Sequence, residues 1–69
     1  MRIQSNLEKL RKRAGMTQEE LGNAVGCSRQ HIYSLEIDIR SASFKLLENL
    51  ARVLKCKVID LFEEIKNND

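Results

Sequence analysis

An arginine and a glutamine stand side by side, as Arg29 and Gln30, in the stretch GCSRQHIYSLE that begins at Gly26. Each of these side chains can form a pair of hydrogen bonds to a base edge in the DNA major groove, arginine to guanine and glutamine to adenine. Such a pair provides roughly 1 to 3 kcal/mol of discrimination between bases. Only Ile32 and Leu35 of this stretch suit a hydrophobic core. The polar side chains are therefore expected to face a DNA groove.

Two successive helices must position these side chains. Ser28 is a good N-cap residue and predicts a helix from about Arg29 to Ile37. Thr17, followed three residues later by Glu20, has the spacing of a capping box. This spacing predicts an earlier helix from Gln18 to about Val25.

The predicted connection between these helices is only two residues long, Gly26 and Cys27. A connection this short with a glycine in it makes the two helix axes cross steeply, which is the geometry of a helix-turn-helix. Gly22 of the earlier helix has no side chain and is expected to let a neighbouring helix approach closely.

Three further helices complete the predicted fold. The letters SNLE from Ser5 fit a capping box and predict a first helix from about Asn6 to Ala14. Ser43 is expected to cap a fourth helix, with Phe44 joining the core at its first turn. The apolar spacing over 58–66 predicts a last helix. Because no segment alternates with period two, the predicted fold class is all-α, with five helices.

Length and composition limit the function classes. The 69 residues, 42% of them hydrophobic and 32% charged, predict a single soluble domain over 1–69, too small for a separate sensing or catalytic domain. No apolar run approaches a membrane span and the N-terminus lacks a secretory signal, so the expected location is cytoplasmic and no membrane partner is expected. The only histidine is His31, and no glycine-rich phosphate loop is present. An enzyme is not expected.

Neither metal nor cofactor is expected either. The two cysteines, Cys27 and Cys56, are far apart in the sequence and do not make a zinc site or a disulfide framework by themselves. Both are expected to be reduced and largely buried. No small-molecule ligand is evident. The net charge of +2 is mild, so an assignment to DNA depends on the motif rather than on the total charge.

The segment TQEELGNAVGCSRQHIYSLE, residues 17–36, resembles the helix-turn-helix of the phage-repressor-like family, the Cro-like or Xre class of transcription regulators. LRKRAGMTQEEL and LLENLARVLKCKVIDLFE are similar to other parts of the same family, so the resemblance covers residues 7–62. It implies a lambda-repressor-like DNA-binding domain in which the second and third helices form the helix-turn-helix. The implied function is that of a small stand-alone transcriptional regulator, and a repressor is expected.

The resemblance also implies roles for single residues. Gln18 corresponds to the glutamine that holds a DNA phosphate in this family, while Arg29 and Gln30 occupy the first exposed turn of the recognition helix. The alternative for Arg29 and Gln30 is that they are solvated surface residues with no role in binding. Ser34, one turn later, is a further base-contacting candidate. An ion pair between Arg11 and Glu36 is expected where related repressors pair these residue types.

The loop after the recognition helix departs from the family pattern. Relatives commonly have glycine, a basic residue and later a proline there, whereas this chain has EIDIRSAS from Glu36. This difference leaves three candidates for phosphate contacts in the loop. They are Arg40, Ser41 and Ser43.

Other exposed candidates have two interpretations each. Three cationic residues are either phosphate partners or ordinary surface charges: Arg13, Arg40 and Lys45. The hydroxyl of Ser28 is expected to contact the DNA backbone. His31 either touches a phosphate or covers the start of its helix. Tyr33 either contacts a base or packs against the following loop.

One recognition helix reads only a few base pairs, so proteins of this shape bind as homodimers to inverted half-sites about 34 Å apart. Four apolar side chains have no evident place in so small a core and are expected at the dimer interface: Ile37, Ile39, Ile59 and Ile65. The alternative for Ile39 and Ile65 is that they complete the monomer core. The alternative function is a protein-interaction module, such as an antitoxin, built on the same scaffold.

Overall fold

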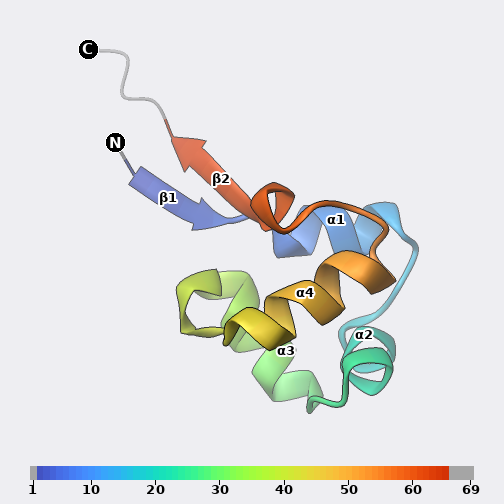
Figure 1. The fold of residues 1–69 in the computed structure, drawn as a ribbon. Coiled ribbons are helices and arrows are strands. Elements are labelled where there is room, and N and C mark those ends of the chain that lie inside the picture. Colours follow the sequence, from blue (N-terminus) through green and yellow to red (C-terminus); the bar gives the residue numbers. More distant parts are fainter. Residues whose placement is uncertain (1, 66–69) are drawn as a thin grey trace.

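The computed structural model describes residues 2–65, which form a helical body with a two-stranded sheet extending from one end (Figure 1). In chain order the elements are β1 (Arg2–Ser5), α1 (Leu7–Arg13), α2 (Gln18–Val25), α3 (Arg29–Ile37), the 3-10 helix η1 (Ile39–Ser41), α4 (Phe44–Val53), the 3-10 helix η2 (Val58–Leu61) and β2 (Phe62–Ile65).

The core is made by one cluster of buried apolar side chains to which all four α-helices and both 3-10 helices contribute. Its members are Leu7, Leu10, Leu21, Ile32, Leu35, Ile39, Leu47, Leu50, Ala51 and Leu61. Full burial of a leucine or isoleucine side chain contributes about 1.5 to 3 kcal/mol. This cluster therefore fixes how α2 and α3 are presented to their surroundings.

Three of the N-caps predicted from the sequence are confirmed. Thr17 and Glu20 form the reciprocal capping box, with Glu20 N donating to Thr17 Oγ1 at 3.0 Å and Thr17 N donating to Glu20 Oε1 at 2.8 Å. Ser28 caps α3 by accepting from the backbone N–H of His31 at 3.0 Å. Ser43 caps α4 in the same way.

The capping box predicted at Ser5 is wrong. α1 begins at Leu7, and its N-cap residue Asn6 makes no side-chain cap bond. Asn6 instead binds the chain near its other end, since its backbone N–H donates to Leu61 O and its side-chain amide to Asp60 O, both at 2.9 Å. These long-range bonds place Ser5 in a strand rather than at a helix start.

The last helix predicted over 58–66 is also wrong, and the fold is not purely α-helical. η2 ends at Leu61, and the next four residues form β2, which pairs antiparallel with β1 from Ser5 opposite Phe62 to Arg2 opposite Ile65. Each strand has only four residues. A strand this short shows too little alternation to be told from a helix turn. Lys66 lies outside the described residues.

Phe44 does not join the core, contrary to the prediction. Its side chain is 67% exposed, and Ser43 and Lys45 beside it are exposed too. The first two residues of α4 therefore lie outside the core, Leu46 packs against it, and full burial on this helix begins at Leu47.

Over the part of the chain that is described, the structure has no helix both long and apolar enough to cross a bilayer.

Candidate nucleic-acid interface

The turn between α2 and α3 sets the angle of the exposed helix α3. Gly26 ends α2 in the left-handed conformation, with φ at 77°, and the N–H of Cys27 donates to Gly22 O at 2.8 Å. A Cβ atom on Gly22 would lie 2.5 Å from the carbonyl oxygen of Cys27. The close approach expected at Gly22 is confirmed, but the neighbour is the backbone of the turn at Cys27 and Ser28 and not the helix predicted from the sequence.

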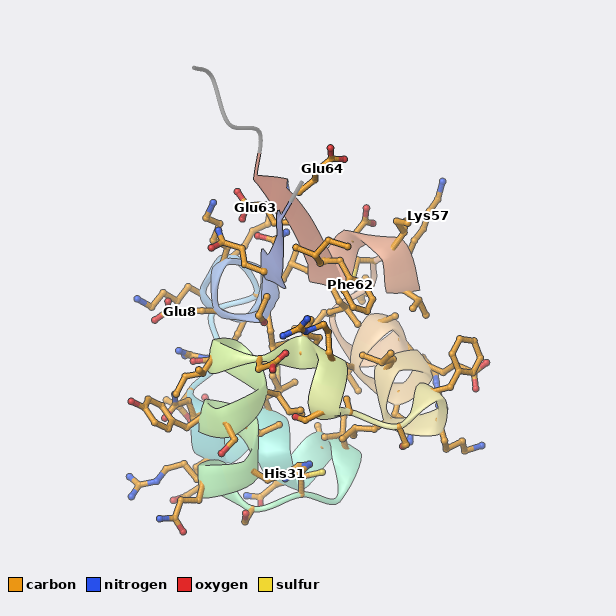
Figure 2. The ribbon with its side chains drawn as sticks, turned by 90° about the vertical axis from the view of Figure 1, so that its left-hand side faces the viewer. Glu8, His31, Lys57, Phe62, Glu63 and Glu64 are labelled. Carbon is orange, nitrogen blue, oxygen red and sulfur yellow. The ribbon has the colours of Figure 1, made fainter. Side chains whose placement is uncertain are left out.

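α3 divides cleanly into a buried side and an exposed side. Ile32 and Leu35 are fully buried. The side chains off this stripe are exposed: Arg29, Gln30, His31, Tyr33 and Ser34. Figure 2 shows His31 at the end of the molecule opposite to the sheet residues Glu63 and Glu64. The first turn of α3 is therefore an open, polar end of the body.

Four side chains from two helices meet at an open hollow of about 230 Å³ on this surface. They are Gln18 at the start of α2 and Arg29, Gln30 and Tyr33 from the first two turns of α3. The structure thus brings the expected phosphate-binding residue next to the expected base-reading residues. Tyr33 lies with them as part of the hollow, and its side chain is 54% exposed.

A buried polar network holds the two helices in this relation. Arg11 Nε lies 2.5 Å from Glu36 Oε2, and the two side chains are only 10% and 6% exposed. This is the ion pair that the resemblance implies. The amide Nε2 of Gln18 donates to Glu36 Oε1 at 2.9 Å, and Arg11 Nη1 donates to Met16 O at 2.9 Å. A glutamine amide has two N–H groups, so one remains to bind a phosphate.

The hydroxyl groups of four serines differ in whether their hydrogen is still available to donate to a phosphate. Ser28 and Ser43 act as acceptors in their caps, so the hydroxyl hydrogen of each is free to donate to a phosphate. Ser34 donates its hydrogen to Gln30 O at 3.1 Å, and Ser41 donates to Asp38 O at 3.0 Å. Phosphate oxygens only accept, so Ser41 is a poor phosphate partner in this arrangement.

Arg40 is exposed but already has an acidic neighbour. Its Nε lies 3.1 Å from Asp38 Oδ1, and that same oxygen accepts from the backbone N–H of Arg40 at 3.0 Å. The hydrogen bonds from the Arg40 side chain and backbone hold the pKa of Asp38 below its ordinary value. The charge of Arg40 is thus locally compensated, and this loop attracts phosphate less than the sequence alone indicates.

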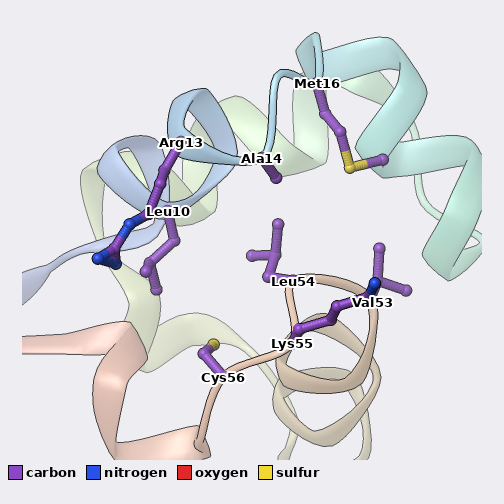
Figure 3. A pocket seen from close by; sticks show the side chains of 8 residues that line it. All are labelled: Leu10, Arg13, Ala14, Met16, Val53, Leu54, Lys55 and Cys56. Carbon is purple, nitrogen blue, oxygen red and sulfur yellow. The ribbon is translucent and has the colours of Figure 1, made fainter.

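Arg13 lies elsewhere. It lines a hollow of about 550 Å³ between the ends of α1 and α4, together with Ala14, Leu54, Lys55 and Cys56 (Figure 3). Burial raises the pKa of the Cys56 thiol, and the charge of Asp60 adds to this effect. Arg13 is therefore not part of the hollow at α3.

Lys45 is exposed in the first turn of α4, beside the cap residue Ser43.

The apolar residues expected at a dimer interface separate into two kinds. Ile37 is 65% exposed and Ile59 is 72% exposed. Ile39 is 1% exposed and belongs to the core cluster, which corrects its assignment to the dimer surface and confirms the alternative that it completes the monomer core. The side chain of Ile65 lies outside the described part of the structure.

A family model described as helix-turn-helix matches residues 7–61, from the first residue of α1 to the last residue of η2. This chain belongs to the helix-turn-helix family. Two proteins of Archaeoglobus fulgidus, each named an uncharacterized HTH-type transcriptional regulator, are 37% identical to it over 60 residues. The aligned part is 87% of this chain and 86% and 84% of theirs. The Cro-like resemblance drawn from the sequence is confirmed.

Two interactions in and just after the helix-turn-helix were not predicted from the sequence. The bond from Gln18 to Glu36 joins residues that are 18 positions apart, and no local pattern indicates it. Asp38 capping η1 through the N–H of Arg40 is local. An aspartate two residues before its donor is a common turn pattern, so that signal was present in the sequence.

Proposed function

We propose that this protein is a sequence-specific regulator of transcription that binds double-stranded DNA, and that it acts as a repressor by occupying an inverted-repeat operator as a homodimer. The observation that supports this most is the single hollow lined by Gln18, Arg29, Gln30 and Tyr33. It combines a residue type that holds phosphate with two residue types that read base edges. In this proposal residues 1–69 act as one DNA-binding module.

Base reading is assigned to the exposed face of α3. Arg29 offers two parallel donors to the N7 and O6 atoms of guanine, and Gln30 offers a donor and an acceptor to adenine. Ser34 already donates to Gln30 O, so in this arrangement its oxygen can only accept, for example from an amino group of cytosine or adenine. Tyr33, at the edge of the hollow, contacts a base from the side.

Backbone binding is assigned to the start of α2 and the two serine caps. The free N–H of the Gln18 amide, together with the first backbone N–H groups of α2, points to a phosphate at the positive end of the helix dipole. Ser28 and Ser43 add hydroxyl donors. These contacts set the register of α3 in the groove without reading sequence. His31, Arg40 and Lys45 add exposed cationic or polar groups nearby.

Repression follows from occupancy alone, because a protein seated on an operator excludes other proteins from the same DNA. Neither a cofactor nor a small-molecule ligand enters this proposal. An enzymatic function is not proposed, since the family and the names of both relatives point to regulation.

Binding to bulk genomic DNA at increasing salt is the first test. Each neutralised phosphate contributes a slope of about −0.9 to the dependence of log affinity on log salt concentration. We expect a shifted band at low salt that weakens steeply between about 50 and 200 mM salt. No binding at low salt would overturn the proposal in favour of a protein-interaction module of the antitoxin kind.

Selection of bound sites from random duplex DNA is the second test. We expect an enriched inverted repeat whose half-sites are centred about one helical turn, or 34 Å, apart. Enrichment of no sequence, with salt-sensitive binding intact, would contradict sequence-specific reading while leaving general DNA binding in place.

A further inference from the structure

The outer edge of β1 carries backbone groups that point away from the rest of the molecule. In an antiparallel pair, residues alternate between those bonded to the partner strand and those whose N–H and C=O face outward. Asn6 N donates to Leu61 O, directly opposite in the register. Because the pattern repeats every two residues, the backbone N–H and C=O of Gln4 also bond to β2, whereas those of Ile3, between the bonded positions, face outward. Within the described residues, the backbone of Ile3 has no other backbone partner.

The side chain of Ile3 is also poorly covered. It is 52% exposed, although its neighbour on the same face of the strand, Ser5, lies closer to the helical body and is half-buried. A two-stranded sheet is at best marginally stable in water. An uncharged, exposed edge residue of this kind is a template for a further strand.

The other edge of the sheet is protected by charge. By the same alternation, Phe62 and Glu64 face outward on β2, and Glu63 stands between them. Glu63 is held by Lys9 of α1, with Nζ and Oε2 3.1 Å apart. A second copy pairing with β2 about a two-fold axis centred on Glu63 or Glu64 would set two Glu63 or two Glu64 carboxylates directly opposite each other. An axis centred on Phe62 would pair only that one residue within the strand, because the residues before it belong to η2. Like charges in that position are destabilising, so β2 does not suit self-pairing.

We propose that β1 is the dimerisation element: the β1 strands of two copies pair antiparallel about a two-fold axis centred on Ile3, forming a four-stranded sheet in the order β2-β1-β1-β2. The N–H of Ile3 in each copy donates to the carbonyl of Ile3 in the other, and the two exposed side chains become direct cross-strand neighbours. This proposal rests on the proposed function insofar as that function requires a homodimer.

The position of the sheet suits this role. Glu63 and Glu64 of the sheet lie at the opposite end of the molecule from His31 in the first turn of α3 (Figure 2). Pairing through β1 therefore leaves both copies of α3 uncovered. The register also sets Gln4 of one copy opposite Arg2 of the other, so no like charges face each other across the new pair.

Amide hydrogen exchange on the unmodified protein tests the pairing directly. In the monomer, the N–H of Gln4 is protected by β2, whereas the N–H of Ile3 exchanges freely. We expect protection of the Ile3 amide to appear as protein concentration rises through the dimer dissociation constant determined by analytical ultracentrifugation. A protein that is dimeric by sedimentation but leaves the Ile3 amide unprotected would overturn the proposal, and so would a protein that stays monomeric at millimolar concentration.

Matched variants give the second test. Ile3→Pro removes an outward N–H but no bond of the β1–β2 ladder, and the loss of two hydrogen bonds per dimer weakens association about 30-fold. Ile3→Lys is expected to abolish the dimer. Ile59→Lys, the same change at another exposed isoleucine, is expected to leave it intact. The reverse pattern would move the interface to η2 and overturn the assignment.

The outcome is separable from the proposed function. Circular dichroism at a concentration where every variant is monomeric checks folding, since an unfolded variant then loses its helical signal. Binding to a DNA fragment holding one half-site checks α3. Monomeric Ile3→Lys that keeps half-site binding but loses tighter binding to the full repeat supports both proposals. A folded wild-type protein that does not bind the half-site would contradict the proposal of DNA binding and leave the proposal of a β1 dimer in place.

Discussion

The amide of Gln18 donates to the carboxylate of Glu36 across 2.9 Å, and that carboxylate is already paired with the guanidinium of Arg11. The first residue of α2 is thus tied to the last turn of α3 by a nearly buried anion. The side chain assigned to a phosphate and the helix assigned to the bases are oriented by one group. Stability and DNA binding are therefore coupled at Glu36.

Removal of that anion is expected to be costly. Glu36→Ala leaves the nearly buried guanidinium of Arg11 without its partner, and breaking such a pair costs about 3 to 5 kcal/mol. Urea unfolding followed by circular dichroism measures the free energy of unfolding. The exposed pair between Lys12 and Glu8 is the control, because Lys12→Ala is expected to change stability by about 0.5 kcal/mol or less. Equal losses in the two variants would contradict a special role for Glu36.

The variants Gln18→Ala and Arg29→Ala are expected to weaken DNA binding in different ways. Gln18→Ala removes a phosphate contact and weakens binding to all sequences alike. The salt slope is expected to stay unchanged, because a neutral amide neutralises no phosphate and releases no counterion. Arg29→Ala removes a base contact, costs about 1 to 3 kcal/mol on the preferred operator and relaxes preference at one base in each half-site. Binding isotherms on the selected operator and on single-base variants separate the two. A uniform loss for Arg29→Ala would remove it from base reading.

Gly22→Ala is expected to destabilise the protein by about 1 to 3 kcal/mol, as in an overpacked core. The new methyl group would overlap the carbonyl of Cys27, which belongs to the backbone and moves only with the whole turn. Asn23→Ala, at the next and exposed position of α2, is the control. Since alanine favours helices, a gain in thermal stability from Gly22→Ala would show that α3 can shift away from α2.

Lys55→Gly is expected to stabilise the fold by about 0.5 to 1 kcal/mol. Lys55 follows α4 in the left-handed conformation, with φ at 55°, where a side chain costs roughly 1 kcal/mol or more. Glycine is favoured at this position after a helix. Lys57→Gly, where φ is −89°, is expected to lower stability instead. Calorimetric melting of both variants checks the sign, and parallel losses would contradict the backbone explanation.

Asp38 is expected to make part of the stability acid-sensitive. Its pKa is lowered in the fold by the hydrogen bonds from Arg40, so its contribution is complete above the unfolded pKa of about 3.9 and is lost as pH falls through the folded value. Melting temperatures of the wild type should therefore fall more between pH 5 and pH 2 than those of Asp38→Asn. Glu19→Gln, an exposed carboxylate, controls for general charge effects. Identical acid profiles for wild type and Asp38→Asn would contradict this.

The sequence predicted those parts of the fold whose signals are local. The capping box at Thr17 and the cap at Ser28 each depend on atoms three residues apart. The close approach at Gly22 could be predicted because a residue without a side chain beside the buried Leu21 indicates a close neighbour, although the neighbour is the turn and not a helix. The two helices and the turn of the helix-turn-helix were therefore predicted from the residues, whereas the role of Gln18 and the pair of Arg11 with Glu36 came from the family resemblance.

The failures share a long separation in the chain. Asn6 looks like a helix start until its bonds to Asp60 and Leu61 are seen, and β1 and β2 pair across nearly the whole chain. Phe44 was expected in the core and is exposed, whereas Ile39, for which both the dimer surface and the core were open, lies in the core. The burial of each depends on how far the core extends, which no local spacing reveals. For the same reason the tie between Gln18 and Glu36 became visible only in three dimensions.

Arg2 and Ile65 lie opposite each other in the sheet, so the chain enters and leaves the fold at one place, at the end far from His31 (Figure 1, Figure 2). A fluorescent reporter or an affinity label attached at either terminus would extend from that end and leave the first turn of α3 unobstructed. A short linker between the strand ends would suit circular permutation, with new termini opened in an exposed loop.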